Sequence, residues 1–302
     1  MKVQFILLAL LTGALSVSAQ TQQLSDWQKL IGKKDYHQSD CDQARKLCES
    51  YIDSKKLSEQ VEAQKCLANV ALCSKDVITL ESDDAGGGNI HGGFQPEAVD
   101  DALAHLKKGI QLAPQDLSIH QGRLHVLEVS GRYDEMIHAI DESCSIYTGK
   151  DALDAWLAYA PELADLRQYK TAVEFMKILD KHYPNNPDII GNIGAFYSLL
   201  KQDKDAIPYL RRSVGLAPND SINAWDLGRE LDYSDQIEEA DKWYRKGMAL
   251  DTDPVQRKKS ACLYAEFVEK RLKDTKRACT LQKADCPVEM QTACTNTADT
   301  VK

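Results

Sequence analysis

Small and apolar residues recur with a period of 34 residues between Leu153 and Asp251. The step joins alanines, glycines, leucines and prolines in one register: Ala172, Ala206 and Ala240; Gly194 and Gly228; Leu216 and Leu250; Pro184 and Pro218. A period of this length is typical of stacked helical hairpins, each of which buries its apolar face against its neighbours. The pattern therefore predicts an all-α helical-hairpin solenoid.

The turns inside the hairpins can be placed along this pattern. They are expected near Gly131-Arg132, Gln168, Asp203 and Ser234. Pro161 falls within the first helix of one hairpin, where its ring and its missing N–H should kink or break the helix. A last helix is expected after Asp253, and its polar, basic outer face suits the end of a repeat array.

This arrangement resembles the tetratricopeptide repeat family. The family places a small residue where the two helices of a hairpin touch, as Gly194 and Ala206 do here. It places an aromatic residue one turn along the first helix, as at Tyr197, and ends the second helix with a proline, as at Pro218. Trp156 falls on the family's early tryptophan position. The resemblance implies a superhelix built from such hairpins.

The resemblance also implies where a partner would bind, because the first helices of the family line a concave groove for peptides or a partner helix. The residues at groove-facing positions of the two clearest repeats are Asp188, Asn192, Ala195, Ser198, Trp225, Arg229 and Tyr233. The last three are four residues apart and share one helix face. Aromatic residues with arginine are the usual composition of a binding hot spot. For Trp225 the alternative is packing between neighbouring hairpins.

Four cysteines near the N-terminus have a symmetrical spacing. Cys41 and Cys48 are seven residues apart, and so are Cys66 and Cys73, which puts each pair on one helix face. In an antiparallel hairpin centred on Leu57, Cys41 lies opposite Cys73, and Cys48 lies opposite Cys66. The sequence therefore predicts two nested disulfides, a layout similar to twin-cysteine helical hairpins of exported and intermembrane-space proteins. A four-cysteine metal site is the alternative, although it would favour Cys-x-x-Cys spacing.

The first residues and the cysteine count indicate export. An apolar run over 5–17 ends in small residues up to Ala19, as in a secretory signal peptide cut after that residue. The run is shorter than the about 20 residues that a transmembrane helix needs, and no membrane span is expected elsewhere. Nine cysteines in an exported chain indicate an oxidising compartment, periplasmic or extracellular.

Nine is an odd number, so at least one cysteine is left over as a free thiol or forms an intermolecular bond, and we expect Cys144 to be the free thiol. The C-terminal cysteines should tie down a polar tail, although their spacing does not determine how they pair: Cys262, Cys279, Cys286 and Cys294.

Segment 81–94 interrupts the helical pattern, because its five glycines disfavour helix. A flexible insertion and a flap over a ligand are two interpretations. A metal site is a third, and its candidate ligands are Glu81, Asp83, Asp84 and His91. Their spacing matches no calcium loop.

Charge and motifs restrict the function further. The formal net charge of −9 argues against binding nucleic acid, whose affinity depends on cations that neutralise phosphates. The chain carries no sequence motif of a nucleophile elbow, a redox Cys-x-x-Cys pair or a His-Glu-x-x-His site. We therefore expect neither enzymatic activity nor a cofactor.

The expected organisation is a signal peptide (1–19), a disulfide-stapled hairpin (20–80), a glycine-rich loop (81–96), a repeat array (97–253) and a capping helix with a cysteine-containing tail (254–302). The hypothesis is an exported scaffold or adaptor that binds a protein or peptide. The alternatives are a small-ligand or metal-binding protein that uses the glycine-rich loop, and an accessory subunit of an extracytoplasmic enzyme complex. The sequence does not indicate the oligomeric state.

The cysteine arrangement gives the first testable prediction. Peptide mapping of the unreduced protein by mass spectrometry should find Cys41 linked to Cys73 and Cys48 linked to Cys66. Reduced thiols at these four positions would contradict it and restore the metal-site alternative.

Overall fold

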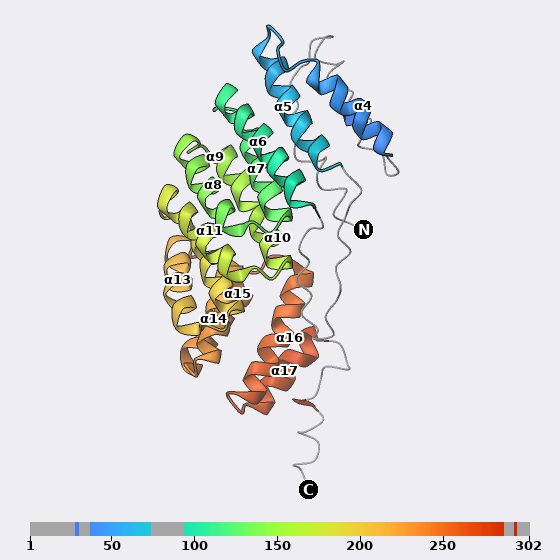
Figure 1. Cartoon of the computed structure of the whole chain (residues 1–302). Coiled ribbons are helices and arrows are strands. Elements are labelled where there is room, and N and C mark those ends of the chain that lie inside the picture. The colour runs from blue at the N-terminus through green and yellow to red at the C-terminus, as the bar shows by residue number, and fades with distance from the viewer. Residues whose placement is uncertain (1–27, 30–36, 74–93, 287–292, 295–302) are drawn as a thin grey trace. The chain divides into compact units, whose positions relative to one another are not determined.

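The computed structural model describes residues 28–29, 37–73, 94–286 and 293–294, and the regular structure in these residues is helical (Figure 1). None of the described helices has the length and apolar character needed to cross a bilayer. The chain divides into two compact units, Met1–Leu166 and Arg167–Lys302. The expected signal peptide and the glycine-rich segment 81–93 lie outside the described residues.

The first unit contains a series of antiparallel helices: α4 (Gln38–Glu49), α5 (Leu57–Ala71), α6 (Pro96–Leu112), α7 (Leu117–Val129), α8 (Tyr133–Ile146), α9 (Lys150–Leu157) and α10 (Tyr159–Asp165). Both predicted cysteine pairs join α4 to the second arm of the hairpin: Cys48 pairs with Cys66 within α5 (Cα–Cα 6.1 Å), and Cys41 pairs with Cys73 just after it (5.9 Å). The sulfurs, with Ala44 and Leu67, form the small core of this hairpin. Each such bridge stabilises a fold by about 2–4 kcal/mol.

Helix α6 shows how the sequence pattern becomes packing. Pro96 occupies the first turn, where its missing N–H costs nothing. The buried residues Val99, Ala102 and Leu106 are three or four positions apart, so they form one face. This face packs against Ala68 of α5 and Ile119 of α7 in a single apolar cluster.

The expected break near Pro161 is confirmed. Helix α9 ends at Leu157 and α10 begins at Tyr159, so Pro161 lies in the first turn of a new helix. In the first turn of a helix the backbone N–H groups have no acceptor in a preceding turn, so the missing N–H of proline costs no hydrogen bond. This divides the first arm of the hairpin into two short helices.

The second unit continues the hairpins: α11 (Tyr169–His182), α12 (Pro187–Leu199), α13 (Asp203–Leu216), α14 (Ser221–Tyr233), α15 (Ile237–Leu250), α16 (Pro254–Lys270) and α17 (Thr275–Asp285). The turns predicted at Gln168, Asp203 and Ser234 are confirmed. At each turn one residue adopts a left-handed conformation, with φ of 56° at Arg167, 58° at Lys201 and 61° at Asp235. Such a residue ends a helix and sends the chain back, so the step of 34 appears in the backbone as well.

The helices of each hairpin approach closely at small residues. A Cβ built on Gly194 would lie 2.6 Å from Leu210 Cγ and 3.3 Å from the carbonyl oxygen of Ala206. At Gly228 it would lie 2.9 Å from Cδ1 of Tyr244. The small residues of the sequence pattern therefore let α12 pack on α13, and α14 on α15.

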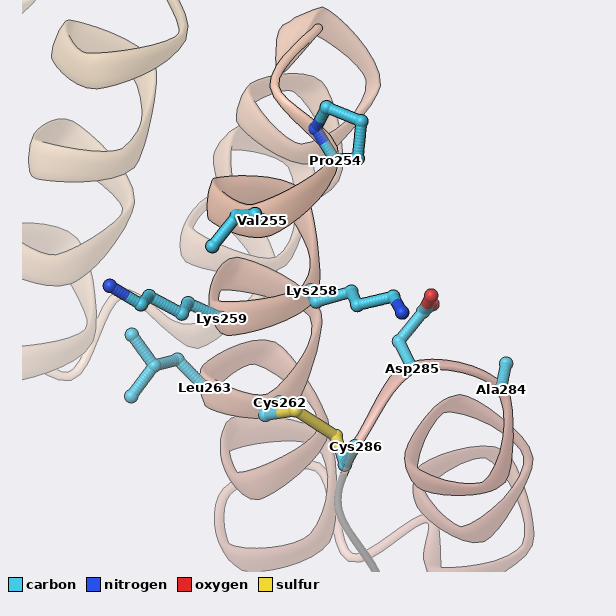
Figure 2. Close-up of a pocket in the computed structure, with 9 residues that line it drawn as sticks. All are labelled: Pro254, Val255, Lys258, Lys259, Cys262, Leu263, Ala284, Asp285 and Cys286. Atoms are coloured by element: carbon cyan, nitrogen blue, oxygen red, sulfur yellow. A yellow bond between two sulfur atoms is a disulfide. The ribbon is translucent and has the colours of Figure 1, made fainter.

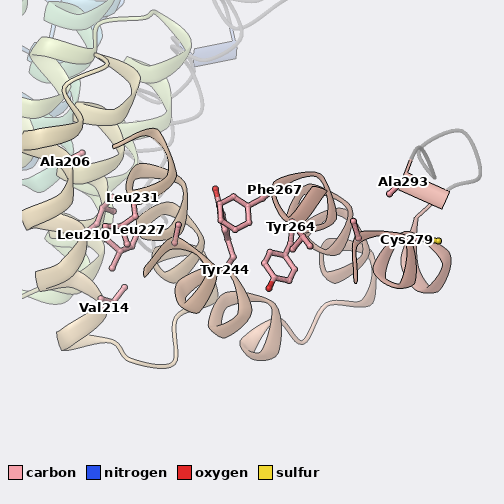
Figure 3. Packing of buried hydrophobic residues seen from close by; sticks show 13 residues of the cluster. Ala206, Leu210, Val214, Leu227, Leu231, Tyr244, Tyr264, Phe267, Cys279 and Ala293 are labelled. Carbon is pink, nitrogen blue, oxygen red and sulfur yellow. The ribbon is translucent and has the colours of Figure 1, made fainter. Parts of the chain in front are cut away.

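A single apolar cluster runs through this unit from Ala206 and Leu210 to Tyr244, Tyr264 and Cys279 (Figure 3). It extends the core into α16 and α17, where the C-terminal cysteines pair as Cys262–Cys286 and Cys279–Cys294. Part of the expected polar tail is therefore a helix, α17. Its C-terminal end is joined to α16 by Cys262–Cys286, and Cys279–Cys294 joins it to residues 293–294.

Gly194 supplies a test of the hairpin contact. Gly194→Ala should lower the free energy of unfolding by about 1–3 kcal/mol, because the added methyl group overlaps Leu210. Gly215→Ala on α13 is the matched control, since a Cβ there meets no atom within 4 Å. It should be neutral or stabilising by up to about 1 kcal/mol, because alanine favours helix. Chemical denaturation followed by circular dichroism measures both, and equal effects would contradict the interpretation.

Candidate partner-binding groove

Two capped helices of the second unit form the walls of a groove. The Asp220 carboxylate accepts a hydrogen bond from the Asn223 backbone N–H (3.0 Å) and starts α14. The Asp253 carboxylate accepts one from the Val255 N–H (2.7 Å), and Pro254 fills the first turn of α16. Between these helices lies a cavity of about 460 Å³, lined mainly by α14 and α16.

The groove exposes large apolar side chains. Ile222 is 70% exposed, Tyr233 is 65% exposed and Leu263 is 60% exposed. All three line the cavity, together with Phe267 at its base. Exposed apolar residues that gather in one concave surface are typical of a contact site, whereas isolated ones are ordinary.

Arg229 is held in place by two carboxylates. Its Nη2 lies 2.8 Å from Asp226 Oδ1, and its Nε lies 3.4 Å from Glu230 Oε1. Glu230 is fully buried and also accepts a hydrogen bond from the Ser198 hydroxyl. Burial raises the pKa of both Asp226 and Glu230, although Arg229 opposes the rise. The guanidinium therefore serves first to neutralise buried carboxylates.

Trp225 has a packing role. Its ring lies 4.9 Å from that of Tyr244, centroid to centroid, and it covers Gly247 of α15. A Cβ on Gly247 would lie 2.7 Å from Trp225 Cδ1. Trp225 therefore packs within its own hairpin, on α15, and not between neighbouring hairpins as in the alternative that we gave, and it also lines the groove.

The structure brings only some of the proposed partner-binding residues together. Trp225, Arg229 and Tyr233 line the cavity between α14 and α16. Asp188, Asn192, Ala195 and Ser198 lie on α12 and are not among the residues that line it. Ser198 reaches α14 only through Glu230.

Sequence reasoning missed the contribution of α16, which we expected only to cap the array. The available signal was the presence of Val255 and Leu263 among the polar residues of this helix, and both are exposed in the structure. A second cavity, of about 830 Å³, lies on the other side of Leu263 (Figure 2). It is bounded by Val255, Lys258 and the Cys262–Cys286 disulfide. Leu263 therefore lines both cavities.

A polar cluster lies in the first unit, among the described residues that have metal-ligating side chains. His125 and Glu128 of α7 and Glu162 of α10 place one ligand atom each within 4.8 Å of one another. Burial lowers the pKa of His125 and raises the pKa of Glu128 to about 7. Burial, followed by repulsion from Glu128, raises the pKa of Glu162 to about 7.

Sequence reasoning missed this cluster because Glu162 belongs to a different helix, far along the chain from His125 and Glu128. The metal ligands that we considered instead, Glu81, Asp83, Asp84 and His91, lie outside the described residues. Cys144 is the free thiol, as expected. It is buried, and burial raises its pKa to about 12, so it does not form a nucleophilic thiolate near neutral pH.

Comparison with known proteins supports the fold. The tetratricopeptide repeat family model matches residues 187–220, which comprise α12, α13 and the turn that follows. These residues form a tetratricopeptide repeat. The described helices as a whole have an all-helical, tetratricopeptide-like repeat fold. A comparison with curated proteins gave no match.

Several solved structures are similar. YrrB, described as a TPR protein with an unusual peptide-binding site, is 18% identical with a TM-score of 0.43, over 63% of this chain and 97% of that one. The pilF protein of Pseudomonas aeruginosa is 14% identical with a TM-score of 0.41, over 67% and 90%. MamA from Desulfovibrio magneticus is 20% identical with a TM-score of 0.36, over 51% and 85%. At these identities the likeness concerns the fold and says nothing about a partner.

The different roles of the two groove aromatics can be tested by stability. Trp225→Ala should lower the free energy of unfolding by about 3 kcal/mol, because it removes a ring packed on Gly247 and Tyr244. Tyr233→Ala should change it by less than about 0.5 kcal/mol, since the side chain is 65% exposed. Urea denaturation of each variant measures the effect. A stable Trp225→Ala protein would show that the ring is not part of the core.

Proposed function

We propose that the protein is a non-catalytic scaffold whose α14–α16 groove binds an amphipathic segment of a partner protein. One observation carries the proposal: Ile222, Tyr233 and Leu263 are each at least 60% exposed and line one cavity of about 460 Å³. Burial of an exposed side chain of this size contributes about 1.5–3 kcal/mol. Three such side chains together contribute about 4.5–9 kcal/mol, which is comparable with the lower part of the about 4–15 kcal/mol that association costs.

The charges of the groove favour an apolar contact over an ionic one. Each cation in its lining is paired with a lining carboxylate: Arg229 with Asp226 (2.8 Å), Lys270 with Glu266 (2.5 Å) and Arg271 with Asp232 (2.7 Å). Asp251 adds one more carboxylate. Binding through the apolar residues should therefore depend little on salt, unlike binding to nucleic acid.

Export is part of the same proposal. Four cysteine pairs at disulfide distance fit an oxidising compartment, either periplasmic or extracellular. The bridges join helices near both ends of the described chain, where they stabilise the terminal hairpins against unfolding.

Selection of random peptides displayed on phage tests the groove. We expect peptides that carry apolar residues at helical or alternating spacing. Leu263→Glu should weaken their binding by about ten- to a hundredfold, because it removes about 1.5–3 kcal/mol of apolar burial. Ile222→Glu should act in the same direction.

Leu216→Glu is the matched control, since Leu216 is 42% exposed on α13 and is not among the lining residues. It should leave binding unchanged. Peptides that bind Leu263→Glu as well as the unaltered protein would contradict the proposal. So would a dimer of the protein alone that Leu263→Glu dissociates, measured by light scattering, because the occupant would then be a second copy.

A further inference from the structure

The polar cluster of the first unit joins two helices that are distant in sequence. His125 and Glu128 are one turn apart on α7, and Glu162 reaches them from α10. The two helices are also joined directly, because the Tyr159 hydroxyl donates a hydrogen bond to the Gln121 carbonyl oxygen (2.9 Å). The three side chains that can bind a metal ion therefore come from two helices, α7 and α10, that are in direct contact.

The atoms at the centre of this cluster lack partners. His125 is 6% exposed and Glu128 is 4% exposed. Neither ring nitrogen of His125 has a hydrogen-bond partner among the described residues, and nor does Oε1 of Glu128. Buried polar atoms without partners are rare in folded proteins and each costs about 1–3 kcal/mol.

No cation among the described residues compensates the two carboxylates. No Lys or Arg among these residues forms an ion pair with Glu128 or Glu162. The two carboxyl groups share a side-chain hydrogen bond with each other, and His125 Nδ1 lies 3.5 Å from Glu128 Oε2. Tyr159 directs its hydroxyl to Gln121. A bound cation would give His125 and Glu128 the partner that the protein does not supply.

We propose that His125, Glu128 and Glu162 bind a divalent transition-metal ion, for which Zn²⁺ is the probe. One imidazole nitrogen and two carboxylate oxygens are ligands that zinc takes, leaving a fourth position for water. Two ligands of a tetrahedral zinc lie about 3.3 Å apart, and the His125–Glu128 separation of 3.5 Å is close to this. The ion would clamp α10 to α7.

Titration calorimetry of the full, untagged and unreduced chain with ZnCl₂, after removal of metals with a chelator, tests the site. We expect one ion per chain and a rise in the melting temperature. Glu162→Gln should raise the Kd by at least about tenfold, since loss of even an outer partner of a metal ligand costs 10–100-fold. Glu162 is half-buried and the amide has the same shape, so the variant should fold, which circular dichroism checks.

Two matched controls separate the site from surface binding. His138→Ala removes an exposed histidine of α8, and Glu142→Gln removes an exposed glutamate of the same helix. Both should bind Zn²⁺ as the unaltered protein does. Co²⁺ bound in place of Zn²⁺ should show visible d–d absorption without a thiolate charge-transfer band, because no cysteine ligates it.

Three results would overturn the proposal. The first is the absence of saturable binding below about 100 μM Zn²⁺. A Kd above this value corresponds to a binding free energy weaker than about 5.5 kcal/mol. The second is binding that Glu162→Gln does not weaken. The third is binding that His91→Ala abolishes and Glu162→Gln leaves unchanged, which would assign the ion to the glycine-rich segment.

Discussion

The close approach of the two helices in each hairpin is the contact on which this structure depends. It requires a residue without a side chain at Gly194 and Gly228, because Leu210 and the ring of Tyr244 occupy the space that a Cβ would fill. Ala206 faces the same contact and is fully buried. A larger residue would separate the helices, and the left-handed turns at Lys201 and Asp235 would no longer bring them together.

A repeat array also has two ends that its neighbours do not cover. At the N-terminal end, the buried cluster between α4 and α5 consists of Ala44, Leu67, Val70 and four cysteines, so two disulfides supply much of its core. At the other end, the Cys262–Cys286 disulfide joins α17 to α16, and Cys279–Cys294 joins α17 to residues 293–294. There the Tyr264 hydroxyl donates to Asp241 (2.6 Å), and Arg277 donates to the same carboxylate (3.0 Å). Cross-links thus replace the missing neighbours.

The functional proposals rest on two places where the fold leaves groups in an unfavourable environment. On α14 and α16, Ile222, Tyr233 and Leu263 remain in water although they line a groove. In the first unit, both ring nitrogens of His125 and Oε1 of Glu128 are buried without a hydrogen-bond partner among the described residues. Departures of this kind from the rules of a stable core are expected at functional sites. Binding of an apolar partner would remove the groove side chains from water, and binding of a cation would give the buried polar cluster a partner.

The sequence by itself determined the features that depend on spacing along one hairpin. The repeat register, the turns at Gln168, Asp203 and Ser234, the break near Pro161 and the two N-terminal cysteine pairs all follow from periodicity and backbone chemistry. The free thiol of Cys144 was also expected, because the cysteine count is odd and this residue lies on a packing face.

Only the tertiary structure decided the features that depend on how separate elements are rotated against each other. It paired Cys262 with Cys286, turned Trp225 onto Gly247 while leaving Tyr233 in water, and brought Glu162 to His125. These contacts join residues of different helices, many positions apart. Their geometry is determined by side-chain packing between the helices, which a one-dimensional spacing does not contain.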